Sequence, residues 1–323
     1  MRDVLLKYGN KLKPAIPFAG LILLAVVYLF VTDFHPTPFH LTTIINQVAV
    51  MAVLSTGAVF IFALGSFDIS LGVAMGVSVC VGILAYNAGA GVVGMLFVCL
   101  AVGIGVSLVN SVLSSVFRLP VFIMTMAMLT VLTAVLQILI GGKSSLLVPS
   151  GIQAPIKAFD NLWVRLLFVG VYFAICLVLF NYTKIGRRNK LVGGSPIVAA
   201  QTGVSIAKQT IITFLISGTG VGLAAFLMLT RAQAVSVDTG ASTGMDVMMA
   251  IVFGGMPLSG GAHSKIAAGI VGSLSIVLVS QILTMLGVSP GLSQVYKAVL
   301  FLAVVFVASL SYREKMLSRA IMF

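Results

Sequence analysis

Apolar stretches separated by short polar segments run through the whole chain. A helix of about 20 residues crosses the hydrocarbon core of a bilayer, and ten segments are apolar enough to form such a helix. By residue number they are 16–32, 44–64, 69–87, 92–117, 120–142, 162–181, 207–229, 246–257, 264–286 and 294–311. The segment 246–257 is short and can be re-entrant, so eight to ten crossings are expected. The pattern predicts an all-α polytopic membrane protein with a single membrane domain over residues 1–323.

Composition supports this class. Hydrophobic residues make up 60% of the chain and charged residues 8%, against roughly 25% charged residues in a soluble domain. No long polar stretch remains that could form a soluble catalytic domain. Cys80, Cys99 and Cys176 lie within apolar segments, so we expect small buried side chains and neither a disulfide framework, a metal site nor a cofactor.

Basic residues gather at the ends of apolar segments and predict the topology. Three clusters stand out: Arg2, Lys7, Lys11 and Lys13; Lys184, Arg187, Arg188 and Lys190; Arg313, Lys315 and Arg319. The positive-inside rule places all three in the cytoplasm, with both termini inside. The first apolar run shows no small-residue cleavage site, so it is expected to be a retained span. This distribution of the net charge of +12 argues for membrane lipid and against nucleic acid.

Two acidic residues, Asp68 and Asp246, lie inside apolar sequence, where a charge costs several kcal/mol. Asp68 belongs to the stretch Gly65–Gly72, which is predicted to interrupt a helix because Gly65 allows a turn. Asp68 can serve only as a cap of the next helix. Alternatively, the broken helix presents polar groups to a solute, or Asp68 relays protons.

A second interruption is predicted at 253–261. It contains Gly254, Gly255, Gly260 and Gly261 together with Pro257, and such a sequence cannot continue an ordinary helix. The two interruptions have similar sequences, which hints at an internal repeat of the kind found in transporters.

Neutral polar residues also lie in or near the spans: Asn46, Gln47, Asn110, Gln137 and Gln281. Hydrogen bonds between helices explain such residues in general. Alternatively they line the path of a polar solute, and Asn110 is the best candidate because it lies in the middle of its span.

The internal segment 191–206 predicts a short helix with defined ends. Ser195 is the expected N-cap, Pro196 the first helical residue and Gly203 the stop. A short apolar helix in the cytoplasm indicates a docking element for a partner, or alternatively a helix lying at the bilayer interface.

The tetrapeptide 141–144, Gly-Gly-Lys-Ser, resembles the end of a phosphate-binding loop. The complete pattern needs a glycine at 137, where the chain has Gln137. The chain is therefore not expected to be an enzyme that binds ATP, and any energy from ATP must come from a partner.

Three motifs carry a resemblance to a known family. They are Gly65–Gly72 with Asp68 and Ser70; Gly193–Val204; and Asp246–Gly261. Together they make residues 45–310 similar to the permease subunit of ABC importers for ribose and related simple sugars, within the branched-chain amino-acid and sugar permease superfamily. The chain departs from the family pattern at Ser195, at the alanine pair 199–200, at Gly244 and at Met256–Pro257.

The resemblance implies a type II, vitamin B12-permease-like fold of about ten helices in a bacterial inner membrane. It also implies a second permease subunit, identical or homologous, a cytoplasmic ATPase and an extracytoplasmic solute-binding protein. Residues implied in coupling to the ATPase are Gly194, Ser195, Pro196, Ala199, Ala200, Gly203 and Val204. Residues implied at the helix interruptions or the pathway are Gly65, Asp68, Ser70, Gly72, Asn110, Asp246, Gly254, Gly255, Gly260 and Gly261.

The expected function is ATP-driven uptake of a monosaccharide. The same resemblance leaves open nucleosides, a furanosyl signalling molecule or branched-chain amino acids as the solute. From another class, a proton-coupled secondary transporter would need no ATPase, but usually has more than one intramembrane acid.

Overall fold

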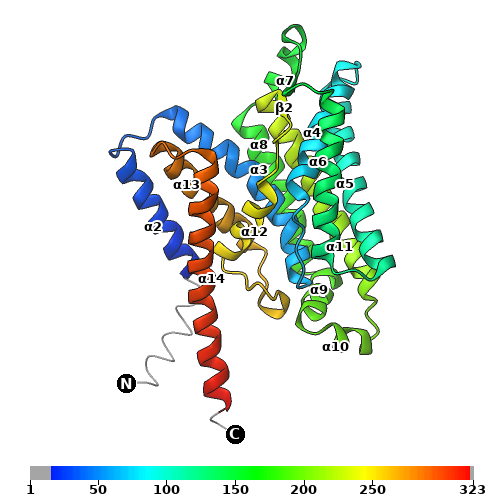
Figure 1. Ribbon diagram of the computed structural model, residues 1–323, viewed down its shortest axis with the longest axis vertical. Helices are drawn as coiled ribbons and strands as arrows, with labels where there is room; N and C mark the ends of the chain where they lie inside the picture. The colour runs from blue at the N-terminus through cyan, green and yellow to red at the C-terminus, as the bar shows by residue number, and fades with distance from the viewer. Residues whose placement is uncertain (1–15, 321–323) are drawn as a thin grey trace.

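The computed structural model describes residues 16–320, and a helix lies at each of the ten predicted positions (Figure 1). These are α2 (Ile16–Val31), α3 (Pro38–Ala63), α4 (Leu71–Asn87), α5 (Gly91–Phe117), α6 (Val121–Ile140), α8 (Leu162–Asn181), α11 (Ile206–Ala232), α12 (Thr243–Phe253), α13 (Ala267–Met285) and α14 (Pro290–Ala320). Six of them are long and apolar enough to cross a membrane: α3, α5, α6, α8, α11 and α13. The protein is thus a polytopic, predominantly helical membrane protein. The basic cluster at positions 2–13 lies outside the described residues.

Helices α3 and α11 form the centre of the molecule. In their most apolar 18-residue stretch, 67% of the residues are buried inside the protein, against 22% in α5 and α6 and 17% in α8. The exposed apolar faces of α5, α6 and α8 are suited to contact lipid. Small residues let α5 approach α11 closely: a Cβ added to Gly103 would lie 2.6 Å from the backbone nitrogen of Gly222. Such close approach through small residues is typical of helix packing within a membrane.

Short elements connect the long helices. Two strands, β1 (Ser145–Leu147) and β2 (Ala234–Ser236), pair antiparallel with Leu146 opposite Val235. They lie near η2 (Ser150–Ile152) and α7 (Ala154–Ala158), at the end of the molecule opposite α9 and α10 (Figure 1). The sequence did not predict this pairing, which joins two loops far apart in the chain: the paired residues Leu146 and Val235 are 89 positions apart. The tetrapeptide 141–144 forms a turn that leads into β1, whereas a phosphate-binding loop leads into a helix.

The internal segment holds two helices rather than the one predicted. Helix α9 (Lys184–Gly194) precedes α10 (Pro196–Gln201). The ends of α10 are as the capping pattern predicts: the Val198 backbone N–H donates to Ser195 Oγ at 3.3 Å, and Gly203 has φ +79° just beyond the helix. Helices α9 and α10 lie at the same end of the molecule as the C-terminal end of α14 (Figure 1).

Both predicted helix interruptions are present. Helix α3 ends at Ala63 and α4 begins at Leu71, with Gly65 at φ +76° between them. Helix α12 ends at Phe253, and the 3-10 turn η3 (Gly261–His263) precedes α13. With only 11 residues, α12 spans about 16 Å at 1.5 Å per residue and cannot cross a bilayer alone.

Candidate functional site

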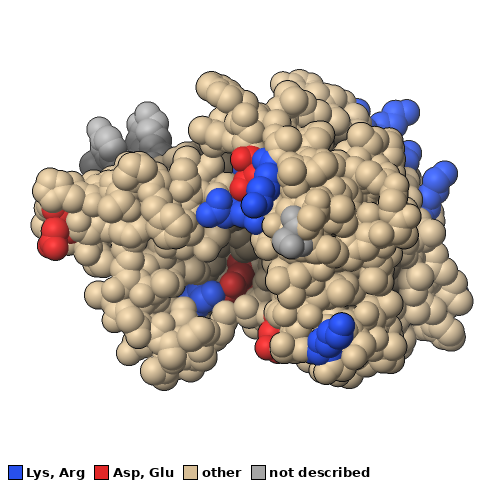
Figure 2. Space-filling model, turned by 90° about the horizontal axis from the view of Figure 1, so that it is seen from above, with Lys and Arg blue, Asp and Glu red and all other residues tan. Residues whose placement is uncertain are grey.

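A cleft of about 670 Å³ lies between α3 and α13 on one side and α8 and α11 on the other. Met75 of α4 and the start of α12 also line it. Figure 2 views the molecule from the end that carries α7 and β2, and shows a hollow with charged side chains of both signs at its rim and inside it. The polar residues that line it are Thr43, Asn46, Gln47, Asp160, Arg165, Arg231, Thr239, Thr243, Asp246 and Ser280. This volume lies within the ~300–1,000 Å³ range of small-molecule sites.

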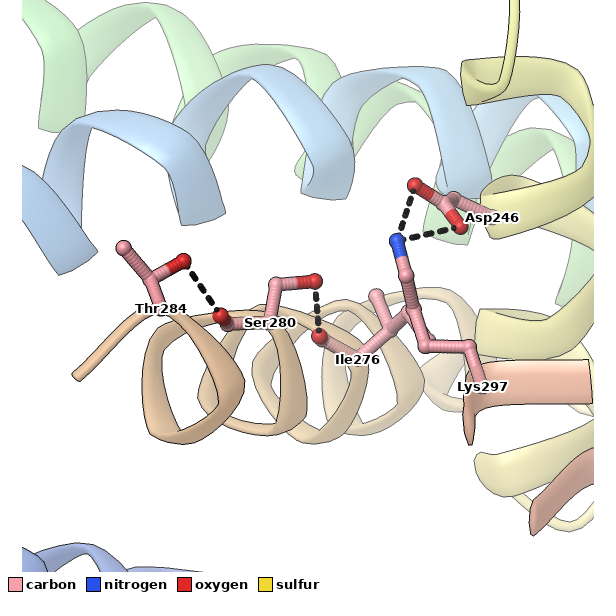
Figure 3. A network of polar contacts seen from close by, with 5 residues as sticks. All are labelled: Asp246, Ile276, Ser280, Thr284 and Lys297. Carbon is pink, nitrogen blue, oxygen red and sulfur yellow. Dashed lines mark hydrogen bonds and ion pairs between the residues drawn. The ribbon is translucent and has the colours of Figure 1, made fainter. Parts of the chain in front are cut away.

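An ion pair joins two helices at this cleft. Lys297 Nζ of α14 donates to both carboxylate oxygens of Asp246, each at 2.9 Å (Figure 3). The lysine is 4% exposed. The Asp246 side chain keeps 16% of its surface and lines the cleft. Asp246 stands in the first turn of α12, where the helix dipole also favours a negative charge. Both charges are therefore compensated, and the carboxylate still faces the cleft.

The α3 wall of the cleft carries two neutral amides. Gln281 of α13 donates to Gln47 Oε1 at 2.9 Å, which is the hydrogen bond between helices expected of such residues. Asn46 is half-buried and, within the described part of the chain, has no hydrogen-bond partner. Ser280 Oγ donates to the Ile276 carbonyl oxygen at 2.9 Å and can still accept.

A second ion pair lies at the mouth of the cleft. Arg165 of α8 is 1% exposed and pairs with Asp160, just before that helix, while Arg231 lines the same region from α11. The predicted span 162–181 includes Arg165 near its external end, and the structure places this residue in the first turn of α8, where Asp160 compensates its charge.

Asp68, Ser70 and Asn110 come together away from the cleft. Asp68 is 5% exposed and accepts hydrogen bonds from the Ser70 backbone N–H at 2.8 Å and from Ser70 Oγ at 2.6 Å. Asn110 Nδ2 of α5 donates to Ser70 Oγ at 2.9 Å. The carboxylate thus shapes the turn that enters α4 and links it to α5. A pathway role of these three residues stays a prediction.

The two helix interruptions meet the end of α9 at one place, here called the glycine junction and formed by Gly65, Gly193, Gly260 and Gly261. A Cβ added to Gly193 would lie 2.1 Å from the Ala63 carbonyl oxygen and 2.8 Å from the backbone nitrogen of Gly261. A Cβ on Gly65 would lie 3.2 Å from the Ser259 carbonyl oxygen. Close backbone contact therefore joins the end of α3, the end of α9 and the loop after α12.

The other predicted glycines also lie at close approaches. Added Cβ atoms would meet a carbonyl oxygen at 2.2 Å for Gly72, against Gly240, and at 2.1 Å for Gly254, against Ala268. Gly255 has φ +86°. The Gly254 contact joins the two sides of the second interruption, whereas the Gly72 contact packs the start of α4 against the loop before α12. These glycines are therefore needed for packing as well as for turning the chain.

Helix α10 is attached directly to the glycine junction. Its inner face holds Ala199, which is 0% exposed and packs with Leu64 and Val192. Its outer face carries Ile197, 73% exposed. Of the other coupling candidates, Gly194, Pro196, Ala200 and Gly203 are exposed, whereas Ser195 and Val204 are half-buried.

Sequence reasoning missed two residues of these sites. Lys297 was left unassigned inside the predicted span 294–311, although a lone lysine there requires an acidic partner and Asp246 was available. Asn189 stands within the basic cluster at 184–190 but is 0% exposed. Its Nδ2 donates to the Phe60 carbonyl oxygen at 3.1 Å and its Oδ1 accepts from Thr213 at 3.1 Å, so it fixes α9 to α3 and α11. Nothing in the local sequence separates it from a solvated asparagine.

Comparison with known proteins identifies the family. The permease component of branched-chain amino acid transport systems matches residues 40–309. The chain belongs to this permease family. It is 24% identical to the ribose import permease protein RbsC of Escherichia coli (strain K12) over 300 residues, covering 89% of this chain and 92% of that protein. It is 26% identical to RbsC of Bacillus subtilis (strain 168) over 294 residues, covering 90% of each.

A third relative extends the range of sugars. The fructose import permease protein FruF of Bifidobacterium longum is 24% identical over 270 residues, covering 82% of this chain and 76% of that protein. No solved structure matches the chain. The match over 40–309 takes in the glycine junction, α10 and the whole cleft, so these features lie within the part of the chain that matches the family.

Proposed function

We propose that this chain is the membrane-spanning subunit of an ATP-driven importer for a simple sugar. The observation that carries the proposal is α10, a capped helix that exposes Ile197 and is joined without a linker to the glycine junction. Membership of a permease family, together with similarity to ribose and fructose import permeases, supports a sugar as the solute. The subunit itself hydrolyses no ATP, and the energy is supplied by a cytoplasmic ATPase.

In this proposal α10 is the docking element for the ATPase. A movement of the ATPase pushes Ile197 and is carried through Ala199, Leu64 and Val192 to the ends of α3 and α9. Gly65 and Gly260 then act as hinges. Both have a positive φ, which glycine adopts without strain, so the chain can change direction at these two residues. The coupling segment 191–206 therefore moves the helices on both sides of the interruptions.

The proposed assembly has two permease subunits, identical or homologous, with one pathway. Ten helices per subunit cross or enter a bacterial inner membrane in a type II fold, α12 entering as a half-helix. Both termini and α10 face the cytoplasm, in line with the basic clusters. A solute-binding protein delivers the sugar to the opposite end, where α7, β1 and β2 lie (Figure 1).

The test is sugar-stimulated ATP hydrolysis by the complete transporter, purified with its ATPase and binding protein. The variant Ile197→Glu should insert normally and abolish stimulation, because an apolar contact is replaced by a charge. Lysine at Ser195 or Gly203 should have the same effect. The matched control is Leu119→Glu, an exposed apolar residue in the turn between α5 and α6. Full stimulation by Ile197→Glu, or uptake without an ATPase, would refute the proposal.

The ATP hydrolysis assay distinguishes the alternative solutes, and a measurement of uptake distinguishes the proton-coupled mechanism. Stimulation by nucleosides or branched-chain amino acids, but by none of ribose, fructose or galactose, would change the solute and keep the mechanism. Uptake that a protonophore stops but ATP depletion does not would instead indicate a secondary transporter.

A further inference from the structure

We propose that the cleft within a single subunit is a binding site for a neutral, polyhydroxylated solute, built on the Asp246–Lys297 pair and the Asn46 amide. The inference rests on the proposed function and adds to it a defined site. It places contacts with the solute on α3 and α12, with Lys297 of α14 holding the Asp246 carboxylate, and none of these residues belongs to the Asp68–Ser70–Asn110 cluster.

The ion pair retains unused hydrogen-bonding capacity. A carboxylate offers about four acceptor positions and an ammonium three donors. Lys297 occupies one position on each oxygen of Asp246 and uses two of its donors in doing so. Because Asp246 lines the cleft, the remaining acceptors can take hydroxyl groups. Hydrogen bonds to charged groups contribute more than those to neutral groups, about 1.5–3 kcal/mol.

Amide groups that can donate hydrogen bonds lie on the α3 wall, opposite the carboxylate acceptors of Asp246. The Asn46 amide is half-buried and unpaired within the described chain, and the Gln47 amide nitrogen is free because only its oxygen accepts from Gln281. A solute between α3 and α12 would therefore meet amide donors on one side and carboxylate acceptors on the other. Hydroxyl groups, which both donate and accept, suit both walls.

The charges of the cleft favour a neutral solute. Asp246 is paired with Lys297 and Asp160 with Arg165, so no uncompensated carboxylate is left in it for a cationic solute. The buried lysine is already occupied by Asp246, and Arg231, a further cation of the lining, is exposed to water, which weakens its attraction for an anion. Met51, Met75 and Ile276 supply apolar surface between the polar groups, which suits the C–H faces of a sugar ring.

The test is protection of an introduced thiol in the complete transporter during turnover. Cys80, Cys99 and Cys176 are buried, so the unsubstituted chain serves as the blank for a water-soluble maleimide. Ser280→Cys places a thiol in the cleft, and Thr243→Cys is the second position in case the first does not fold. The matched control is Asn87→Cys, exposed at the end of α4. The probes are D-ribose, D-fructose and D-galactose.

The transported sugar should slow maleimide modification at Ser280→Cys several-fold and leave Asn87→Cys unchanged. Adding Asn46→Leu should remove this protection, whereas adding Gln137→Leu, an exposed amide on α6, should not. Equal modification rates with and without the sugar, while uptake continues, would overturn the site and leave the proposed function standing. Absence of uptake of all three sugars by the unsubstituted complex would overturn the proposed function itself.

Discussion

Lys297 illustrates what a charge inside a membrane helix requires. An isolated lysine at the centre of a span costs about 2.5–3.5 kcal/mol on insertion scales. Here both oxygens of Asp246 accept from its Nζ, and the pair links α14 to α12. The attraction is strong because water is largely excluded, yet neither residue is stable there without the other. The position of α14 therefore depends on this contact.

Removing one partner of the pair should destabilise the protein. Asp246→Ala leaves Lys297 buried and unpaired, and the loss of a buried partner typically costs about 3–5 kcal/mol. We expect a lower thermal unfolding temperature of the purified subunit in detergent, together with loss of uptake. The exchange Asp246→Lys with Lys297→Asp should recover part of the stability. An Asp246→Ala subunit as stable as the unsubstituted chain would contradict this role.

At the scale of single residues, sequence reasoning found acids more readily than their partners. Asp68 and Asp246 stand out because acidic residues are rare in this chain. The lysine of the predicted span 294–311, Lys297, requires an acidic partner, but its local sequence does not show which one. Asn189 could not be found at all. Its burial follows from where α9 packs, and that packing depends on contacts with Phe60 and Thr213, distant in the sequence.

At the scale of elements, the glycine junction depends on the absence of side chains at defined positions. Gly193 and Gly194 are neighbours at the end of α9, but their surroundings differ. A Cβ on Gly193 would lie 2.1 Å from the Ala63 carbonyl oxygen, whereas a Cβ on Gly194 would meet nothing within 4 Å. Only the first position forces two backbones apart.

Gly193→Ala should therefore impair transport, and Gly194→Ala should not. The added methyl group pushes α9 away from the end of α3 and so weakens the connection between α10 and the interruptions. The measurement is sugar-stimulated ATP hydrolysis per inserted transporter, with Gly194→Ala as the matched control. Equal activity of the two variants would show that close contact at this junction is not needed for coupling.

The packing of α5 on α11 allows a similar comparison. A Cβ on Gly103 would lie 2.6 Å from the Gly222 nitrogen and 2.7 Å from the Gly218 carbonyl oxygen, whereas Gly105 has open space. Gly103→Ala should lower the free energy of unfolding by about 1–3 kcal/mol through overpacking. Gly105→Ala should change it by less than about 1 kcal/mol. Denaturation of the two purified variants in mixed micelles measures the difference, and equal losses would contradict the packing argument.

Apolar runs predicted the helices well because burial in lipid requires each span to satisfy its own backbone. Boundaries differed by a few residues, as at α12, which begins at Thr243 rather than 246. The glycine-rich interruptions were also recognisable from the local sequence, because glycine and proline disfavour a helix. That they meet each other at Gly193, and that β1 pairs with β2, could not be predicted, since each contact joins segments far apart in the chain.

At the scale of the whole molecule, the cleft and α10 lie at opposite ends. Figure 1 places α10 at one end and β2 and α7 at the other, and Figure 2 shows the hollow from the latter. Between them stand the interruptions at 65–70 and 254–266, on α3–α4 and α12–α13. The same helices that form the cleft, α3, α12 and α13, therefore begin or end near the glycine junction, so a movement at α10 can change the shape of the cleft.

This arrangement requires that the two ends face opposite sides of the membrane, which gives the last prediction. Ile197→Cys on α10 and Ile152→Cys beside α7 are both exposed, at 73% and 38% in the native side chain. A membrane-impermeant maleimide should label Ile152→Cys in intact cells, and Ile197→Cys only after the membrane is opened. The three native cysteines are buried and give little background. Labelling of both positions in intact cells would contradict the placement of the two ends on opposite sides, and labelling of Ile197→Cys alone would reverse the topology inferred from the basic clusters. The cleft would then open to the cytoplasm, and the ATPase and the binding protein could not dock at the ends proposed for them.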